Sequence, residues 1–152
     1  MEQVKKVDLN WGELGFAYKK TDWRYVRRYR NGVWEDPVMS EDNCLRVEEG
    51  ATALHYGQTC FEGLKAFTAK DGRVLLFRPD QNARRMIMSC QRLIMAYPTV
   101  EDFVQACVDV CRRNLSWIPP YGSGASFYLR PFVFGCGHNL GVKPAPEYIF
   151  SV

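Results

Sequence analysis

Two short turn signals constrain the fold of this chain more than any other feature. Asn31-Gly32 follows a run of aromatic and charged residues at 21–30, and Asp71-Gly72 lies between two apolar runs. Asn-Gly and Asp-Gly are typical of tight hairpin turns, because such turns need residues that accept a positive φ angle. We therefore predict a hairpin with a type I′ turn at Asn31-Gly32 and a second hairpin that pairs residues 62–68 with 73–77. Both hairpins require antiparallel strands.

Two stretches have the periodicity of helices. Apolar side chains recur at helical spacing over 86–94, after Pro79, which suits the first turn of a helix. A second apolar stripe covers 103–115, and Thr99 with Asp102 before it resembles a capping box. Two helices and about five or six strands predict an α+β domain, with the two main helices on one side of a mostly antiparallel sheet.

Three further segments add to this expectation. Residues 51–61 are predicted to form a short helix. The run at 125–134 is a strongly apolar strand candidate, and Pro131 within it indicates an edge or bulged position, because proline cannot donate a hydrogen bond to the ladder. Another strand is expected to begin at 147 and to reach the last residue of the chain, residue 152.

Composition limits the classes of function. The chain has 152 residues, 47% hydrophobic and 14% aromatic, which suits one domain with a sizeable core. A net charge of +3 is too mild to indicate nucleic-acid binding, and no apolar run approaches the roughly 20 residues of a membrane span. Without a signal-peptide core, a cytoplasmic location is expected. The six cysteines, which include no Cys-x-x-Cys pair, are predicted to be reduced thiols, and no metal site is expected.

Two arginines are candidates for anion binding. Arg85 ends FRPDQNARR at 77–85, a strand-to-helix corner that suits an anion, although a solvated surface charge is the common alternative. Tyr128 and Arg130 are two apart, so on a strand they point to the same face. Among apolar neighbours Arg130 is expected to be partly buried and to need an anionic partner. That partner is either an internal carboxylate or the carboxylate of a substrate, to which Tyr128 would add a hydroxyl donor.

Four motifs follow one another along the chain: LGFAYKKTD at 14–22, LHYGQTCFEGLKAF at 54–67, FRPDQNARR at 77–85, and GASFYLRPFVFG with NLGVKPAPEYIF at 124–135 and 139–150. Together they resemble the branched-chain amino acid aminotransferases, which depend on pyridoxal 5′-phosphate. The resemblance covers nearly the whole chain and implies transfer of an amino group between leucine, isoleucine or valine and 2-oxoglutarate. Relatives that act on D-amino acids or aminodeoxychorismate share the fold, but the motif combination favours the branched-chain group.

The resemblance also implies roles for single residues. Arg85 matches the arginine that binds the cofactor phosphate, and Arg130 matches the one that contacts the side-chain carboxylate of glutamate. For Arg130, the resemblance therefore favours the substrate over an internal carboxylate. The loop at 139–142 matches one that reaches into the partner subunit's pocket, which implies a homodimer. The residues expected to line the substrate pocket are Phe16, Tyr56, Tyr128, Arg130, Leu140 and Val142.

The family's chemistry needs a lysine that forms a Schiff base with the cofactor, and no lysine of this chain stands in the matching context. Lys65, within FEGLKAF, is expected to be a solvated strand residue. We therefore expect residues 1–152 to be the small N-terminal domain of a two-domain aminotransferase, without a catalytic residue, inactive alone and purified without cofactor. The alternative is a stand-alone, non-catalytic binding or dimerisation module of the same fold.

Overall fold

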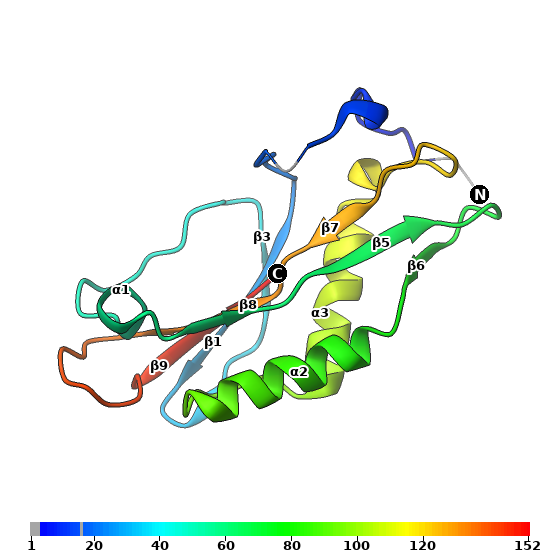
Figure 1. The fold of residues 1–152 in the computed structure, drawn as a ribbon. Coiled ribbons are helices and arrows are strands. Elements are labelled where there is room, and N and C mark those ends of the chain that lie inside the picture. The colour runs from blue at the N-terminus through cyan, green and yellow to red at the C-terminus, as the bar shows by residue number, and fades with distance from the viewer. Residues whose placement is uncertain (1–3, 16) are drawn as a thin grey trace.

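A computed structural model describes residues 4–15 and 17–152 of the chain (Figure 1). Within these residues the chain forms a six-stranded sheet, a three-stranded sheet and two long helices. In chain order the elements are the 3₁₀ helix η1 (Trp11–Glu13), β1 (Arg24–Arg30), β2 (Val33–Trp34), β3 (Val38–Ser40), α1 (Thr52–Tyr56), β4 (Thr59–Phe61), β5 (Leu64–Thr68), β6 (Val74–Leu76), α2 (Pro79–Arg92), α3 (Val100–Arg113), the 3₁₀ helix η2 (Leu115–Trp117), β7 (Phe127–Leu129), β8 (Phe132–Cys136) and β9 (Glu147–Ser151).

All the strand pairs are antiparallel, as the sequence predicts. The larger sheet has the order β2-β1-β9-β8-β4, and β3 also pairs with β1. Both predicted hairpins are confirmed: β1 and β2 meet at Asn31-Gly32, with φ angles of 52° and 82°, and β5 pairs with β6 across the turn that contains Gly72. The last strand, β9, lies between β1 and β8 and is buried along most of its length.

The single strand expected over 125–134 is wrong. Pro131 divides this run, so that β7 belongs to the smaller sheet, of order β6-β5-β7, and β8 belongs to the larger one. The chain also crosses between the sheets at Glu62-Gly63, which separates β4 from β5. The backbone N–H of Glu62 donates to the carbonyl of Pro131 at 2.8 Å, so the two crossings lie side by side.

The helix expected over 51–61 is shorter than predicted. Gly57, at a φ angle of 62°, caps α1 after Tyr56, and the chain then becomes extended as β4. Because such crossings and turns keep the strands short, the described residues form nine strands rather than the five or six that the sequence suggests.

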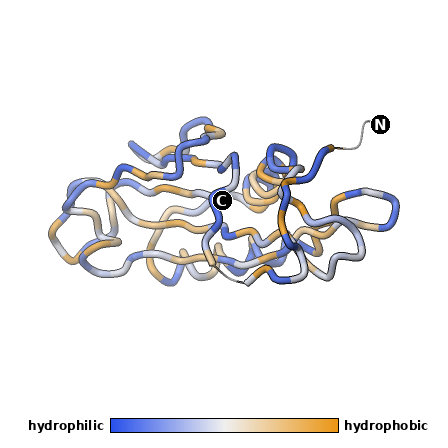
Figure 2. The backbone as a smooth tube through the Cα atoms, turned by 90° about the horizontal axis from the view of Figure 1, so that it is seen from above, coloured by the Kyte–Doolittle hydropathy of each residue, from blue (hydrophilic) through white to orange (hydrophobic). Residues whose placement is uncertain are grey.

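The two long helices pack against each other and against the sheets. The side chain of Thr99 accepts a hydrogen bond from the backbone N–H of Asp102 at 3.0 Å, which confirms the predicted cap of α3. Hydrophobic residues run along the helices and strands, and hydrophilic ones gather in several of the outer loops (Figure 2). The main core joins apolar side chains of α2 and α3 to both sheets, among them Met86, Cys90, Phe103, Cys107, Val110, Leu129, Val133 and Phe150.

The larger sheet is covered on its other face as well. Phe134 and Ile149 belong to a second, smaller cluster with Ala51, which lies next to α1. The strands β8 and β9 are therefore buried on both faces, which explains their almost continuous apolar sequence. All six cysteines are free thiols, as predicted. In the described part of the chain, no helix has the length and apolar character that crossing a bilayer requires.

Candidate functional site

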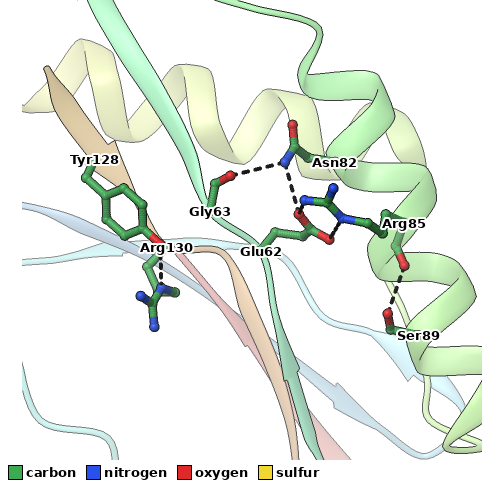
Figure 3. Close-up of polar contacts among 7 residues, drawn as sticks. All are labelled: Glu62, Gly63, Asn82, Arg85, Ser89, Tyr128 and Arg130. Atoms are coloured by element: carbon green, nitrogen blue, oxygen red, sulfur yellow. Dashed lines mark hydrogen bonds and ion pairs between the residues drawn. The ribbon is translucent and has the colours of Figure 1, made fainter.

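Three of the site candidates, Arg85, Tyr128 and Arg130, lie where the chain crosses between the two sheets. Three consecutive residues at the first crossing each lie against one candidate, and Figure 3 draws two of them, Glu62 and Gly63. Phe61 contacts Arg130, Glu62 contacts Arg85, and Gly63 approaches Tyr128. The crossing thus links two groups of side chains that are far apart in sequence.

Arg85 forms a two-pronged ion pair with Glu62. Its Nε donates to one carboxylate oxygen of Glu62 at 2.7 Å, and its Nη2 donates to the other. Asn82, three residues earlier on α2, donates to the same carboxylate at 2.9 Å and to the carbonyl of Gly63 at 3.2 Å. The side chain of Glu62 is 4% exposed, whereas that of Arg85 is 67% exposed. The hydrogen bond to Glu62 raises the pKa of Arg85, so its guanidinium stays charged.

The expectation that Arg130 is partly buried is wrong, because its side chain is exposed. The strand β7 ends at Leu129, so Arg130 lies beyond the ladder at the second crossing. Its Nε donates to the hydroxyl of Tyr128 at 3.1 Å, which confirms that these two side chains point to the same side. The guanidinium lies over the rings of Phe61 and Tyr128, 4.3 and 5.2 Å from their centroids.

An internal carboxylate partner for Arg130 is not found. Between the described residues there are six ion pairs, and none of them includes Arg130. Aromatic rings therefore hold the guanidinium, and its charge is not neutralised by an acid of the described chain. Of the two alternatives that the sequence leaves open, the internal carboxylate therefore finds no support among the described residues.

A cavity of about 790 Å³ lies beside this arginine. Tyr128 and Arg130 are in its wall, and Lys65, exposed as predicted, lines it too. Segments far away in sequence complete the wall, including Leu14 and Tyr18 from the start of the chain. Arg85 is not among the described residues that line this cavity.

The remaining candidates form a separate group. Tyr56 ends α1, and its hydroxyl donates to the carbonyl of Leu140 at 2.6 Å. Leu140 and Val142 are 73% and 88% exposed, so their apolar side chains project from this loop into solvent. Within the described residues, no hydrogen bond or ion pair joins this group to Arg130. Phe16 lies outside the residues that the structure describes.

Sequence reasoning missed the contributions of Phe61, Glu62 and Gly63. Phe61 is 60% exposed although it is a large aromatic residue, and its ring packs against the guanidinium of Arg130. A β-carbon at Gly63 would lie 2.5 Å from the hydroxyl oxygen of Tyr128, so the position of Tyr128 requires glycine there. The only signal in the sequence was an acid and a glycine between two apolar segments, which does not reveal contacts with residues that are distant along the chain.

Comparison with known proteins shows which family this chain resembles in sequence. No protein-family model matches the chain. The chain is 53% identical over 145 residues to the branched-chain-amino-acid aminotransferase of Haemophilus influenzae and 52% identical over 145 residues to that of Helicobacter pylori. These matches cover 95% of the chain. The chain belongs to the branched-chain aminotransferase family. It spans 42% and 43% of the length of these two relatives, so it corresponds to part of such an enzyme.

Solved branched-chain aminotransferases share the fold described above. The Escherichia coli enzyme superposes with a TM-score of 0.64 at 26% identity, over 88% of this chain and 40% of that enzyme. A second such enzyme, solved in complex with N-(5′-phosphopyridoxyl)-L-glutamate, gives 0.62 at 27% identity, over 87% of this chain and 40% of that one. The methionine aminotransferase BCAT4 of Arabidopsis thaliana is 42% identical over 148 residues, so members at similar distance carry different substrate names.

Proposed function

We propose that this chain is the small N-terminal domain of an aminotransferase that moves the amino group between branched-chain L-amino acids and 2-oxoglutarate. The observation that carries this proposal is the exposed Arg130. Tyr128 and Phe61 hold it, and it forms no ion pair within the described chain. A guanidinium in this state is available to the second carboxylate of glutamate or 2-oxoglutarate.

The same place suits a branched-chain side chain. Phe61 contributes an exposed aromatic ring directly beneath the guanidinium. An apolar substrate would pack on this ring and on that of Tyr128, and a dicarboxylate would bind the arginine above it. One wall therefore offers both an apolar surface and a positive charge, which a transaminase that uses both kinds of substrate needs.

The residues of this chain fit a pyridoxal 5′-phosphate cofactor at Arg85. Its guanidinium is exposed in the second turn of the 14-residue helix α2, and its Nη1 makes no hydrogen bond within the described residues. Arginine binds phosphate with paired N–H groups, so this edge suits the phosphate of the cofactor. When bound, the cofactor supplies the electron sink for the reaction. The chain's own contribution is to hold the phosphate and to orient the substrate.

We further propose that the catalytic lysine belongs to a second domain outside residues 1–152 and that the protein acts in the cytoplasm as a homodimer. The exposed Leu140 and Val142 support the dimer, because apolar side chains on a projecting loop suit an interface. The hydrogen bond from Tyr56 to Leu140 would hold this loop in position for the partner's pocket.

The test is a chimera in which residues 1–152 replace the matching part of the Haemophilus influenzae enzyme. We expect the chimera to bind pyridoxal phosphate and to transaminate leucine with 2-oxoglutarate, and residues 1–152 alone to fold without activity. A folded chimera that binds the cofactor but turns over no branched-chain amino acid would contradict the proposed substrates. A stable self-association of residues 1–152 without any activity in the chimera would instead support the alternative, a stand-alone module.

A further inference from the structure

The carboxylate of Glu62 is fixed more firmly than an ordinary ion-pair partner. It lies 4% exposed at the crossing, where its own backbone N–H is bonded to Pro131 and its side chain accepts from Asn82. Asn82 also bonds the carbonyl of Gly63, so the crossing and α2 are joined at two points. Glu62 is therefore anchored at the crossing, and Arg85 is the exposed partner of the pair.

We propose that Glu62 is a positioning residue that fixes the guanidinium of Arg85 for a phosphate group, an inference that rests on the function proposed above. Arginine has five N–H donors. Glu62 takes one from Nε and one from Nη2, which leaves the two on Nη1 and the second on Nη2. One N–H of Nη1 and the second N–H of Nη2 lie along the outer edge of the guanidinium, and the other N–H of Nη1 points back towards Cδ. The side chain of Arg85 is 67% exposed, so this edge is open to a ligand.

The positioning has a physical benefit for binding. An exposed arginine samples many rotamers, and a phosphate that binds it must offset the lost freedom. Because Glu62 already holds the guanidinium, less freedom remains to be lost when the phosphate arrives. The carboxylate also repels the phosphate, but the guanidinium stands between the two anions and the site is open to water, which screens this repulsion.

A purely structural role is the competing explanation. A buried carboxylate needs a cation, and Arg85 would serve that need without any ligand. The two explanations differ in one respect. A structural pair affects the stability of the fold, whereas a positioning pair also affects how well the folded protein distinguishes a phosphorylated ligand from the same ligand without its phosphate.

The first test measures the arrangement itself in residues 1–152. In ¹⁵N NMR spectra, the Nε–H of Arg85 should exchange with water more slowly than that of Arg84, its exposed neighbour on α2. Glu62→Gln should remove most of this protection. Asp71→Asn, which breaks the exposed pair between Asp71 and Arg73, is the matched control and should leave it unchanged. Equal exchange at Arg85 and Arg84 in the unaltered chain would overturn the proposal.

The second test measures ligand preference in the chimera. Dissociation constants for pyridoxal 5′-phosphate and for pyridoxal are measured by absorbance for Glu62→Gln, for Arg85→Ala and for the double variant. Glu62→Gln should weaken binding of the phosphorylated ligand about tenfold, the lower end of what the loss of a supporting residue costs at metal sites, and should leave the binding of pyridoxal unchanged. In the Arg85→Ala background it should have no further effect on either ligand.

The results distinguish the positioning role of Glu62 from the phosphate role of Arg85. If Arg85→Ala weakens the phosphorylated ligand and Glu62→Gln does not, Glu62 is structural and the positioning proposal is wrong, while the function proposed above stands. If Arg85→Ala leaves the preference for phosphate unchanged, both the phosphate role of Arg85 and the positioning proposal are overturned.

Discussion

The guanidinium of Arg130 lies over the ring of Phe61, with 4.3 Å between its central carbon and the ring centroid. These residues come from the two neighbouring crossings, which the hydrogen bond between Glu62 and Pro131 holds together. The contact therefore depends on the way the chain passes between its sheets rather than on either sheet alone. It places a charge and an apolar surface at one position.

Replacing Arg130 should separate the two kinds of substrate. In the chimera, Arg130→Leu should lower kcat/KM for glutamate and 2-oxoglutarate. The loss should correspond to about 1.5–3 kcal/mol of transition-state stabilisation, the value of a hydrogen bond to a charged group. Leucine should be affected much less, because it brings no second carboxylate. Arg84→Leu, on the exposed side of α2, serves as the control. Equal losses for glutamate and leucine in steady-state kinetics would identify Arg130 as structural.

Removing Arg85 should also affect the fold. Arg85→Ala leaves the carboxylate of Glu62 buried, with Asn82 as its remaining side-chain partner. We expect the free energy of unfolding to fall by about 1–2 kcal/mol, less than for a fully buried pair because the guanidinium is exposed. Adding Glu62→Gln should recover part of this loss. Urea unfolding of residues 1–152 measures all three variants, and an unchanged midpoint for Arg85→Ala would show that the pair contributes nothing.

Gly63 should be sensitive to a single methyl group. In Gly63→Ala the new β-carbon would lie 2.5 Å from the hydroxyl oxygen of Tyr128, so the tyrosine must move and lose its contact with Arg130. We expect KM for 2-oxoglutarate in the chimera to rise several-fold, with only a small loss of stability, because the end of a side chain yields easily. Gly63→Ala combined with Tyr128→Phe should be no worse for KM than Tyr128→Phe alone. A further loss in the double variant would argue against this contact as the cause.

Stability should fall in alkali. Burial raises the pKa of Cys111 from 9.0 to about 11 and that of Tyr25 from 10.0 to about 12. Between these values the unfolded chain releases a proton that the folded chain keeps, so unfolding becomes easier as pH rises. The contribution of both groups to the free energy of unfolding is fully present below about pH 9. We expect each group to lower that free energy by about 2–3 kcal/mol as pH rises from its unfolded pKa to its folded pKa. Urea unfolding at about pH 8 and about pH 11 tests this, and Cys111→Ala should reduce the loss between them.

The hairpins were predictable because their turn residues act locally. Asn31-Gly32 and Asp71-Gly72 set the turns themselves, and the register of each pair follows. The effect of Pro131 was predicted only in part. The sequence shows that a strand is disturbed there, but whether the chain then stays in one sheet or enters another depends on distant partners, here Glu62.

Candidate site residues could be named from the sequence, but their arrangement could not. The family motifs identified Arg85 and Arg130 as candidates for anion binding, while the exposure of Arg130 contradicted its apolar sequence context. Glu62 was not identified, because an acid between two strands is usually solvated. Its burial arises only when α2 packs over the crossing and brings Asn82 and Arg85 to it.

The position of the catalytic lysine tests the proposed domain identity most directly. Residues 1–152 alone and the chimera are incubated with pyridoxal phosphate, reduced with borohydride and digested for mass spectrometry. We expect the chimera to carry about one label per chain, on a lysine beyond residue 152, and the isolated chain to carry no stoichiometric label. Lys65, which lines the cavity beside Arg130, is the residue to watch. Stoichiometric labelling of Lys65 or another single lysine in the isolated chain, together with turnover of leucine, would contradict the proposal.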